Sequence, residues 1–78
     1  MSAFPAFVSN DVIPITPSDT TDLVNGVLEC TGTGGTVVVR TTADNDRTYT
    51  IATGGQLKCT IKKVYAASTA TGLVLYPM

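Results

Sequence analysis

The sequence contains no histidine and no tryptophan, and only 14% of its residues are charged. A chain without histidine lacks the commonest general base and metal ligand of proteins. Two cysteines without any imidazole do not make a structural zinc site, and a serine or cysteine nucleophile would have no histidine to activate it. We therefore expect no catalytic residue, no cofactor and no metal, and predict that the protein is not an enzyme.

Charge of either sign is scarce. Five lysines and arginines face six acidic residues, for a net charge of −1. Affinity for nucleic acid requires clustered basic residues, so no nucleic-acid partner is expected. No apolar run approaches the roughly 20 residues that span a bilayer, and the first residues lack the basic region and apolar core of a signal peptide. These absences predict a protein made in the cytoplasm, with no membrane partner.

Stabilisation is a problem for a chain of 78 residues. This length predicts one domain with a modest core, which usually needs a disulfide, a metal or a neighbouring subunit. Cys30 and Cys59 could form one bridge. In the cytoplasm thiols stay reduced, so we expect both to be small buried hydrophobic residues, with a disulfide as the alternative. Homo-oligomerisation is therefore the favoured means of stabilisation, and threonine-rich faces with little charge suit contact with another protein.

Short segments of alternating apolar and polar residues predict strands, and no segment has a helical period over three turns. Pro14 lacks an amide hydrogen, which places its strand at a sheet edge or makes it irregular. Residues 16–23, "TPSDTTDL", fit one helical turn or a β-turn. The fold class expected is all-β, a small antiparallel β-sandwich or barrel of about six to seven short strands. The strands expected are 11–16, 27–30, 36–42, 47–52, 56–62 and 73–78.

The alternation also predicts which side chains face the core. Slippage of the alternation at Lys63 and Val64 indicates a β-bulge. Residues 44–46, "DND", are interpreted as a turn, because the segment lacks the glycine and distal glutamate of a calcium loop. The side chains expected to face inward are Tyr49, Ile51, Leu57, Cys59 and Ile61. Ile13 and Ile15 are expected to share one face of their strand, as are Leu28 and Cys30. Val37 and Val39 are expected to lie opposite Val38 and Arg40, and an aspartate at Val38 or Ile51 would test which face is buried.

Residues 31–42, "TGTGGTVVVRTT", combine glycines with an apolar run. A dinucleotide-binding loop needs a third glycine where Val37 stands, followed by a helix, and a P-loop needs a lysine that is absent. Phosphate binding is therefore not expected. We interpret Gly32, Gly34 and Gly35 as part of a link between two antiparallel strands, in which glycines adopt positive φ.

Protein contacts are the remaining candidate function. Residues 1–10 are predicted to form an N-terminal arm, and residues 11–78 a single β-domain. Phe4, Pro5 and Phe7 in the arm either fold onto their own core or dock onto a neighbour. Lys58, Lys62 and Lys63 form a small basic patch, either a solvated edge or a surface for an acidic neighbour. The candidate interface residues are Phe4, Pro5, Phe7, Lys62, Lys63, Tyr76 and Met78.

The order of these motifs resembles a known family. "ITPSDTTDL", "GTGGTVVV", "TIATGGQL" and "KKVYAASTATGLVLY" together resemble the small head-spike base and capsid decoration proteins of tailed phages and gene-transfer agents, over roughly residues 13–76. The resemblance implies a cement protein or head-spike base on the outside of a virion capsid. Its partners would be the major capsid protein, copies of itself and a spike fibre protein. The arm and the closing "YPM" lie outside the shared pattern.

A glycan- or receptor-binding β-module of a phage tail or host-recognition assembly is the alternative function. Sugar sites usually offer an aromatic platform, and the chain has three tyrosines and two phenylalanines. Because Tyr49 is predicted to lie in the core, Tyr65 is the platform to test.

Overall fold

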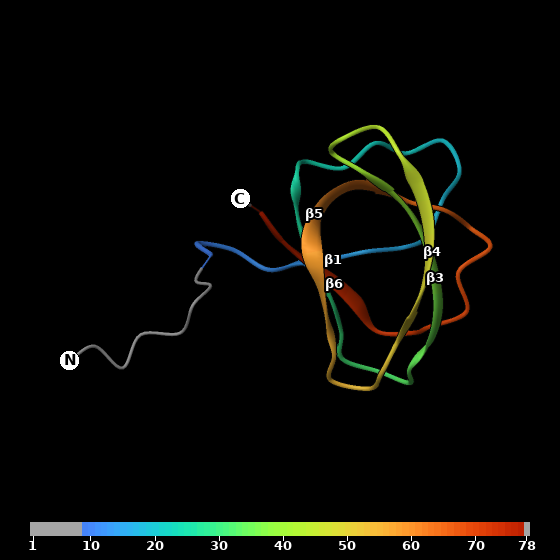
Figure 1. The fold of residues 1–78 in the computed structure, drawn as a ribbon. Coiled ribbons are helices and arrows are strands. Elements are labelled where there is room, and N and C mark those ends of the chain that lie inside the picture. The colour runs from blue at the N-terminus through green and yellow to red at the C-terminus, as the bar shows by residue number, and fades with distance from the viewer. Residues whose placement is uncertain (1–8, 78) are drawn as a thin grey trace.

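The computed structural model of the protein describes residues 9–77 and consists of six strands (Figure 1). The expectations for Phe4, Pro5, Phe7 and Met78 lie outside the described residues. The described part contains no helix, and thus no helix that could cross a membrane. The predicted all-β class is confirmed. The strands are β1 (Ile13–Pro14), β2 (Gly26–Cys30), β3 (Gly35–Thr41), β4 (Asp46–Ile51), β5 (Gln56–Val64) and β6 (Leu73–Pro77).

All six strands belong to one sheet with the order β1-β6-β2-β5-β3-β4, and every neighbouring pair is antiparallel. The two ends of the sheet are β1 and β4. Pro14 thus lies in an edge strand, as its missing amide hydrogen predicts. Figure 1 shows the strands curling around a central region. A single curled sheet has the form of a barrel rather than of a two-sheet sandwich.

The core lies inside this curl and is built by alternation along the strands. Leu28 and Cys30 of β2 are fully buried, as predicted for Cys30. Val37 and Val39 of β3 share one face, as expected, and it is this face that is buried rather than that of Val38. Ile13 and Ile15 pack against the cluster from the edge. Apolar burial of this kind is the main stabilising contribution in a domain of this size. The buried residues are Leu28, Cys30, Val37, Val39, Ile51, Leu57, Ile61, Val64, Ala70, Leu73 and Leu75.

Strand β5 deviates from regular pairing at two places. Opposite β3, the register shifts between Arg40, which pairs with Lys63, and Thr41, which pairs with Ile61. This bulge confirms the predicted slippage and explains why Ile61 and Val64, three residues apart, are both buried. Opposite β2, the partners shift from Thr60 to Gln56 while β2 advances from Val27 to Glu29.

Two inward predictions are wrong. Cys59 lies in the second irregularity of β5 and is exposed, while Cys30 is buried, and both thiols are free. Tyr49 pairs with Val37 across the ladder and so points to the core side of the sheet, yet it is 49% exposed. Because β4 is the edge strand, no strand of residues 9–77 lies beyond it to cover the tyrosine ring.

The "TGTGG" segment differs from its prediction in two respects. It joins β2 to β3, which are not neighbours, because β5 lies between them. Its glycines do not adopt positive φ, which is seen among the described glycines only at Gly54 and Gly72. Glycine is needed here for a different reason, because another part of the backbone passes too close to leave room for a Cβ. A Cβ at Gly34 would lie 2.6 Å from Ile51 O, closer than real Cβ contacts.

Two of the other connections, those after β1 and after β5, run along neighbouring strands instead of protruding as turns. Residues 16–25 form no helical turn; Ser18 N donates to Val64 O and Leu23 N donates to Lys62 O, both at 2.8 Å, so the connection follows β5. Residues 65–72 follow β3, where Tyr65 N and Thr69 N donate to Val38 O and Thr36 O. The turn predicted at residues 44–46 lies at residues 42–44, because Asp46 already belongs to β4. Residues 53–54 form another turn, and the backbone is left-handed at Asp44 and Gly54.

Threonine hydroxyls saturate much of the backbone in these connections. Thr69 Oγ1 accepts from Thr36 N, Thr71 Oγ1 from Thr33 N, and Thr53 Oγ1 from Gly34 N, each at 2.9 Å. Paired backbone groups need not be solvated, so the connections can lie flat against the barrel. These threonines therefore have a structural role within the chain. The sequence had suggested only that threonine-rich faces suit contact with another protein.

Candidate functional site

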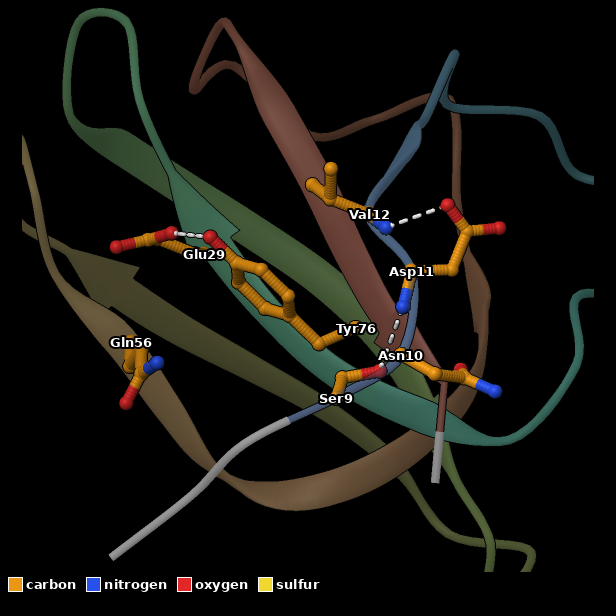
Figure 2. Close-up of a pocket in the computed structure, with 7 residues that line it drawn as sticks. All are labelled: Ser9, Asn10, Asp11, Val12, Glu29, Gln56 and Tyr76. Atoms are coloured by element: carbon orange, nitrogen blue, oxygen red, sulfur yellow. Dashed lines mark hydrogen bonds between the residues drawn. The ribbon is translucent and has the colours of Figure 1, made fainter. Parts of the chain in front are cut away.

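A pocket of about 510 Å³ lies on the outer side of the barrel, where the start of the described chain crosses β2, β5 and β6 (Figure 2). Its size falls in the usual range for ligand or side-chain binding sites, about 300–1,000 Å³. We call it the Tyr76 pocket. Its lining residues are Ser9, Asn10, Asp11, Val12, Glu29, Gln56 and Tyr76.

Strand alternation brings Glu29 and Tyr76 to this pocket. Leu28 and Leu75, which pair across β2 and β6, point into the core, so their chain neighbours Glu29 and Tyr76 point outward. Tyr76 Oη donates a hydrogen bond to Glu29 Oε1 (Figure 2). Gln56 pairs with Glu29 from the β5 side, which extends the same outer surface. Sheet register alone therefore assembles three of the lining side chains.

The opposite wall comes from residues 9–12. Ser9 Oγ donates to Pro77 O at 2.7 Å, which fastens this segment to the end of β6. Asp11 N approaches Ser9 Oγ at 3.4 Å, and Val12 N donates to Asp11 Oδ1 at 2.8 Å, so the segment is locally folded (Figure 2). Val12 is 50% exposed at the rim.

The chemistry of the pocket is that of recognition. Its charged side chains, Asp11 and Glu29, are both acidic, and no basic side chain lines it. The hydrogen bond to Glu29, followed by burial and the charge of Glu29, raises the pKa of Tyr76 above its ordinary value. A tyrosine is protonated at neutral pH in any case, and the raised pKa extends this state to more alkaline pH, so the phenol acts as a hydrogen-bond donor.

The predicted basic patch is largely neutralised by the chain itself. Lys62 Nζ contacts Asp44 Oδ1, and Lys63 Nζ lies 3.2 Å from Asp22 Oδ1 and 5.8 Å from the centre of the Tyr65 ring. Lys58 is exposed. The expectation that this patch is a sheet edge is wrong, because β5 lies between β2 and β3.

A polar cluster next to this patch joins three elements. Arg40 Nε lies 3.0 Å from Asp46 Oδ1, and Tyr65 Oη donates to the same oxygen at 2.8 Å. These contacts lower the pKa of Asp46, chiefly through the hydrogen bond from Arg40, and raise that of Arg40. Lys62 likewise lowers the pKa of Asp44. The cluster connects β3 and β4 to the segment after β5.

Of the predicted interface residues, the structure places Tyr76 in the pocket and Lys62 and Lys63 in the ion-paired patch. Sequence reasoning missed the other pocket residues. A signal was present in Glu29, the only glutamate of the sequence, which alternation already placed on the outer face. No pattern could reveal residues 9–12, because their position depends on the long-range bond from Ser9 to Pro77.

No protein-family model and no curated protein matches the chain. A solved structure does: a chain of the capsid of a native gene-transfer agent (GTA) particle, computed with C5 symmetry, superimposes with a TM-score of 0.75. The two sequences are 34% identical, and the match covers 88% of this chain and 83% of that one. Likeness of sequence and fold over nearly the whole length of both chains indicates common ancestry rather than convergence between small β-folds.

Proposed function

Because the chain belongs to the family of this gene-transfer-agent capsid chain, we propose that it is a structural protein of a tailed-phage-like capsid. The observation that carries the proposal is the 34% identity together with the TM-score of 0.75 over most of both chains. A non-enzymatic role in a virion follows from the same relationship. The acidic, hydrogen-bonding character of the Tyr76 pocket is compatible with assembly through protein contacts.

We further propose that the protein sits on the capsid exterior, as a cement (decoration) protein or as a head-spike base. Its partners would be the major capsid protein, copies of itself and, for a spike base, a fibre protein. Support comes from the small size, the low charge and the motif resemblance over roughly residues 13–76. Assembly would take place in the host cytoplasm.

The proposed contacts with neighbouring proteins involve residues near both ends of the chain and the lysines of β5. Phe4, Pro5 and Phe7 of the proposed arm, residues 1–10, would dock onto a neighbour outside the β-domain of residues 11–78. Tyr76 and Met78 would contribute at the other end, and Lys62 and Lys63 at the side. Since both lysines already pair with carboxylates, an acidic neighbour would have to compete with Asp44 and Asp22.

Location in the intact particle tests the function directly. A density map of particles containing the protein should show its six-stranded barrel on the outer surface, and particles lacking the gene should lose that density. Density inside the shell, or purified protein that fails to bind capsids lacking it, would overturn the exterior role.

The arm is tested separately. Removal of residues 1–8, or replacement of Phe4 and Phe7 by serine, should reduce capsid occupancy strongly while the thermal unfolding midpoint of the isolated domain changes little. Ser2→Ala is the matched control. Unchanged occupancy after deletion would refute docking by the arm.

The glycan-binding alternative loses support at Tyr65. Its hydroxyl donates to Asp46 Oδ1, and its ring lies beside Lys63 Nζ, so the side chain is engaged within its own chain. A reproducible glycan-array signal that disappears in Tyr65→Ala would reinstate this alternative.

A further inference from the structure

The two ends of the sheet have different surfaces. Strand β4 forms one end, and every residue from Asp46 to Thr50 is exposed. An edge strand leaves a row of backbone amides and carbonyls without a sheet partner, which favours contact with another chain. At the other end, β1 follows directly after Asp11 and Val12 of the Tyr76 pocket.

Arg47 on β4 and the acidic side chains of the Tyr76 pocket are unpaired charges of opposite sign; Lys58 on β5 and Asp19 in the connection before β2 also form no ion pair in the described chain. Arg40, Lys62 and Lys63 each pair with an aspartate of the same chain. Within residues 9–77, the remaining basic residues, Arg47 and Lys58, form no ion pair, and Arg47 lies on β4. The carboxylates of Asp11 and Glu29 likewise have no basic partner in this range, and both line the Tyr76 pocket. One unpaired cation, Arg47, thus lies on the β4 edge, and two unpaired anions, Asp11 and Glu29, lie together in the Tyr76 pocket.

Two exposed apolar side chains lie beside these charges, while a third, Val24, lies in the connection before β2. Three large hydrophobic residues of the described chain are exposed, namely Val12 at 50%, Val24 at 58% and Tyr49 at 49%. Tyr49 is two residues from Arg47 on β4, so both side chains point to the same side of the strand. Val12 is at the rim of the pocket, next to Asp11. Each end of the sheet therefore pairs an exposed apolar side chain with unpaired charge, of opposite sign at the two ends.

We infer that the β4 edge of one copy docks into the Tyr76 pocket of the next copy, with Arg47 meeting Asp11 and Glu29, and Tyr49 packing on Val12. This inference rests on the part of the proposed function that makes the protein a homo-oligomer, and it names the two surfaces involved. The contact is heterologous, because two different patches meet, so repetition closes a ring when the rotation between copies allows closure. Charge complementarity fixes the partner and orientation, and burial of the apolar pair adds attraction.

Charge reversal on the full-length protein tests the contact. Asp11 and Arg47 are both exposed, so Asp11→Arg and Arg47→Glu should fold with unchanged circular dichroism and thermal midpoint. In sedimentation velocity over a range of concentrations, each single variant should raise the dissociation constant for self-association at least tenfold. The double variant should recover most of that loss, since the pair is restored with its signs exchanged. Lys58→Glu removes the other unpaired cation, changes the net charge equally and should leave self-association unchanged.

The inference is overturned if the unaltered protein is monomeric at all concentrations, if the single variants associate normally, or if the double variant is no better than the singles. Capsid binding, measured in parallel, separates this result from the proposed function. Normal binding to capsids with self-association insensitive to charge reversal would refute the interface alone. Self-association that follows the charge pattern without any capsid binding would refute the capsid role and support the interface.

Discussion

Gly32 N donates a hydrogen bond to Thr71 O at 3.2 Å, and a Cβ on Gly32 would lie 2.7 Å from that same oxygen. The glycine at position 32 thus leaves room for the backbone of residues 31–34 to pass close to the backbone of residues 69–72. This relationship explains the sequence "TGTGG" without any phosphate and without positive φ.

Gly32→Ala should destabilise the protein by about 1–3 kcal/mol, because the added methyl group forces the two backbones apart. Urea unfolding followed by circular dichroism measures the change. Thr33→Ala is the matched control, since this exposed residue uses its backbone rather than its hydroxyl in the connection. Equal stability of Gly32→Ala and the natural protein would contradict the close approach.

Thr71→Val should cost about 0.5–1.5 kcal/mol, because the isosteric side chain cannot accept the hydrogen bond from Thr33 N. Thr48→Val changes the same atoms at an exposed position of β4 and should cost nothing comparable. Chemical denaturation of both variants compares them directly. A cost that is the same at both positions would show that the hydroxyl of Thr71 has no special role.

Ile51→Asp and Tyr49→Asp test burial on the same side of β4. Ile51 is 2% exposed, so an unpaired carboxylate there should cost several kcal/mol and leave little folded protein. Tyr49 is 49% exposed, so its variant should keep the fold. Near-native circular dichroism of Ile51→Asp would refute the described facing.

Thiol reactivity distinguishes the two cysteines. Because Cys59 is exposed and Cys30 is buried, one thiol per chain should react rapidly with a chromogenic disulfide reagent under native conditions and two in denaturant. Cys59→Ser should abolish the rapid reaction. A rapid reaction that survives in this variant would mean that Cys30 is accessible.

Acid should weaken the fold through Asp44 and Asp46. Their pKa values are lowered in the folded protein from the ordinary value of 3.8, chiefly by hydrogen bonds from Lys62 and Arg40. A carboxyl whose folded pKa is lowered stabilises the fold fully above its unfolded pKa, and this contribution disappears as pH falls through the folded pKa. Stability in Asp46→Asn should therefore depend less steeply on pH below about 4 than in the natural protein. Equal slopes in acid urea titrations would contradict the assignment.

Much of the barrel could be predicted because its signals are local. Alternation grouped Leu28 with Cys30 and Val37 with Val39 correctly, since each strand has one buried face. The prediction failed at Tyr49 and Cys59, where burial depends on what lies beside the strand. Tyr49 is on an edge and Cys59 is in a register irregularity, and neither property is encoded within a few residues.

The candidate site was predicted only in part, for the same reason. Tyr76 was identified, but Ser9, Asp11 and Val12 reach it through a contact between positions 9 and 77. Lys62 and Lys63 were identified as charged, while their pairing with Asp44 and Asp22 depends on how the connections fold back on β5.

By itself the sequence determined the all-β class and the short alternating strands, since these follow from residue chemistry and local period. The order of its motifs also indicated a capsid-related protein. Only the tertiary structure decided the strand order, the reason for the glycines and the positions of unpaired Arg47 on the β4 edge and of Asp11 and Glu29 in the Tyr76 pocket. The physical reason is that strand order, close approach and ion pairing join residues far apart in the chain. Gly32 and Thr71 illustrate this, because their contact joins positions that are brought together only when the sheet has formed and curled.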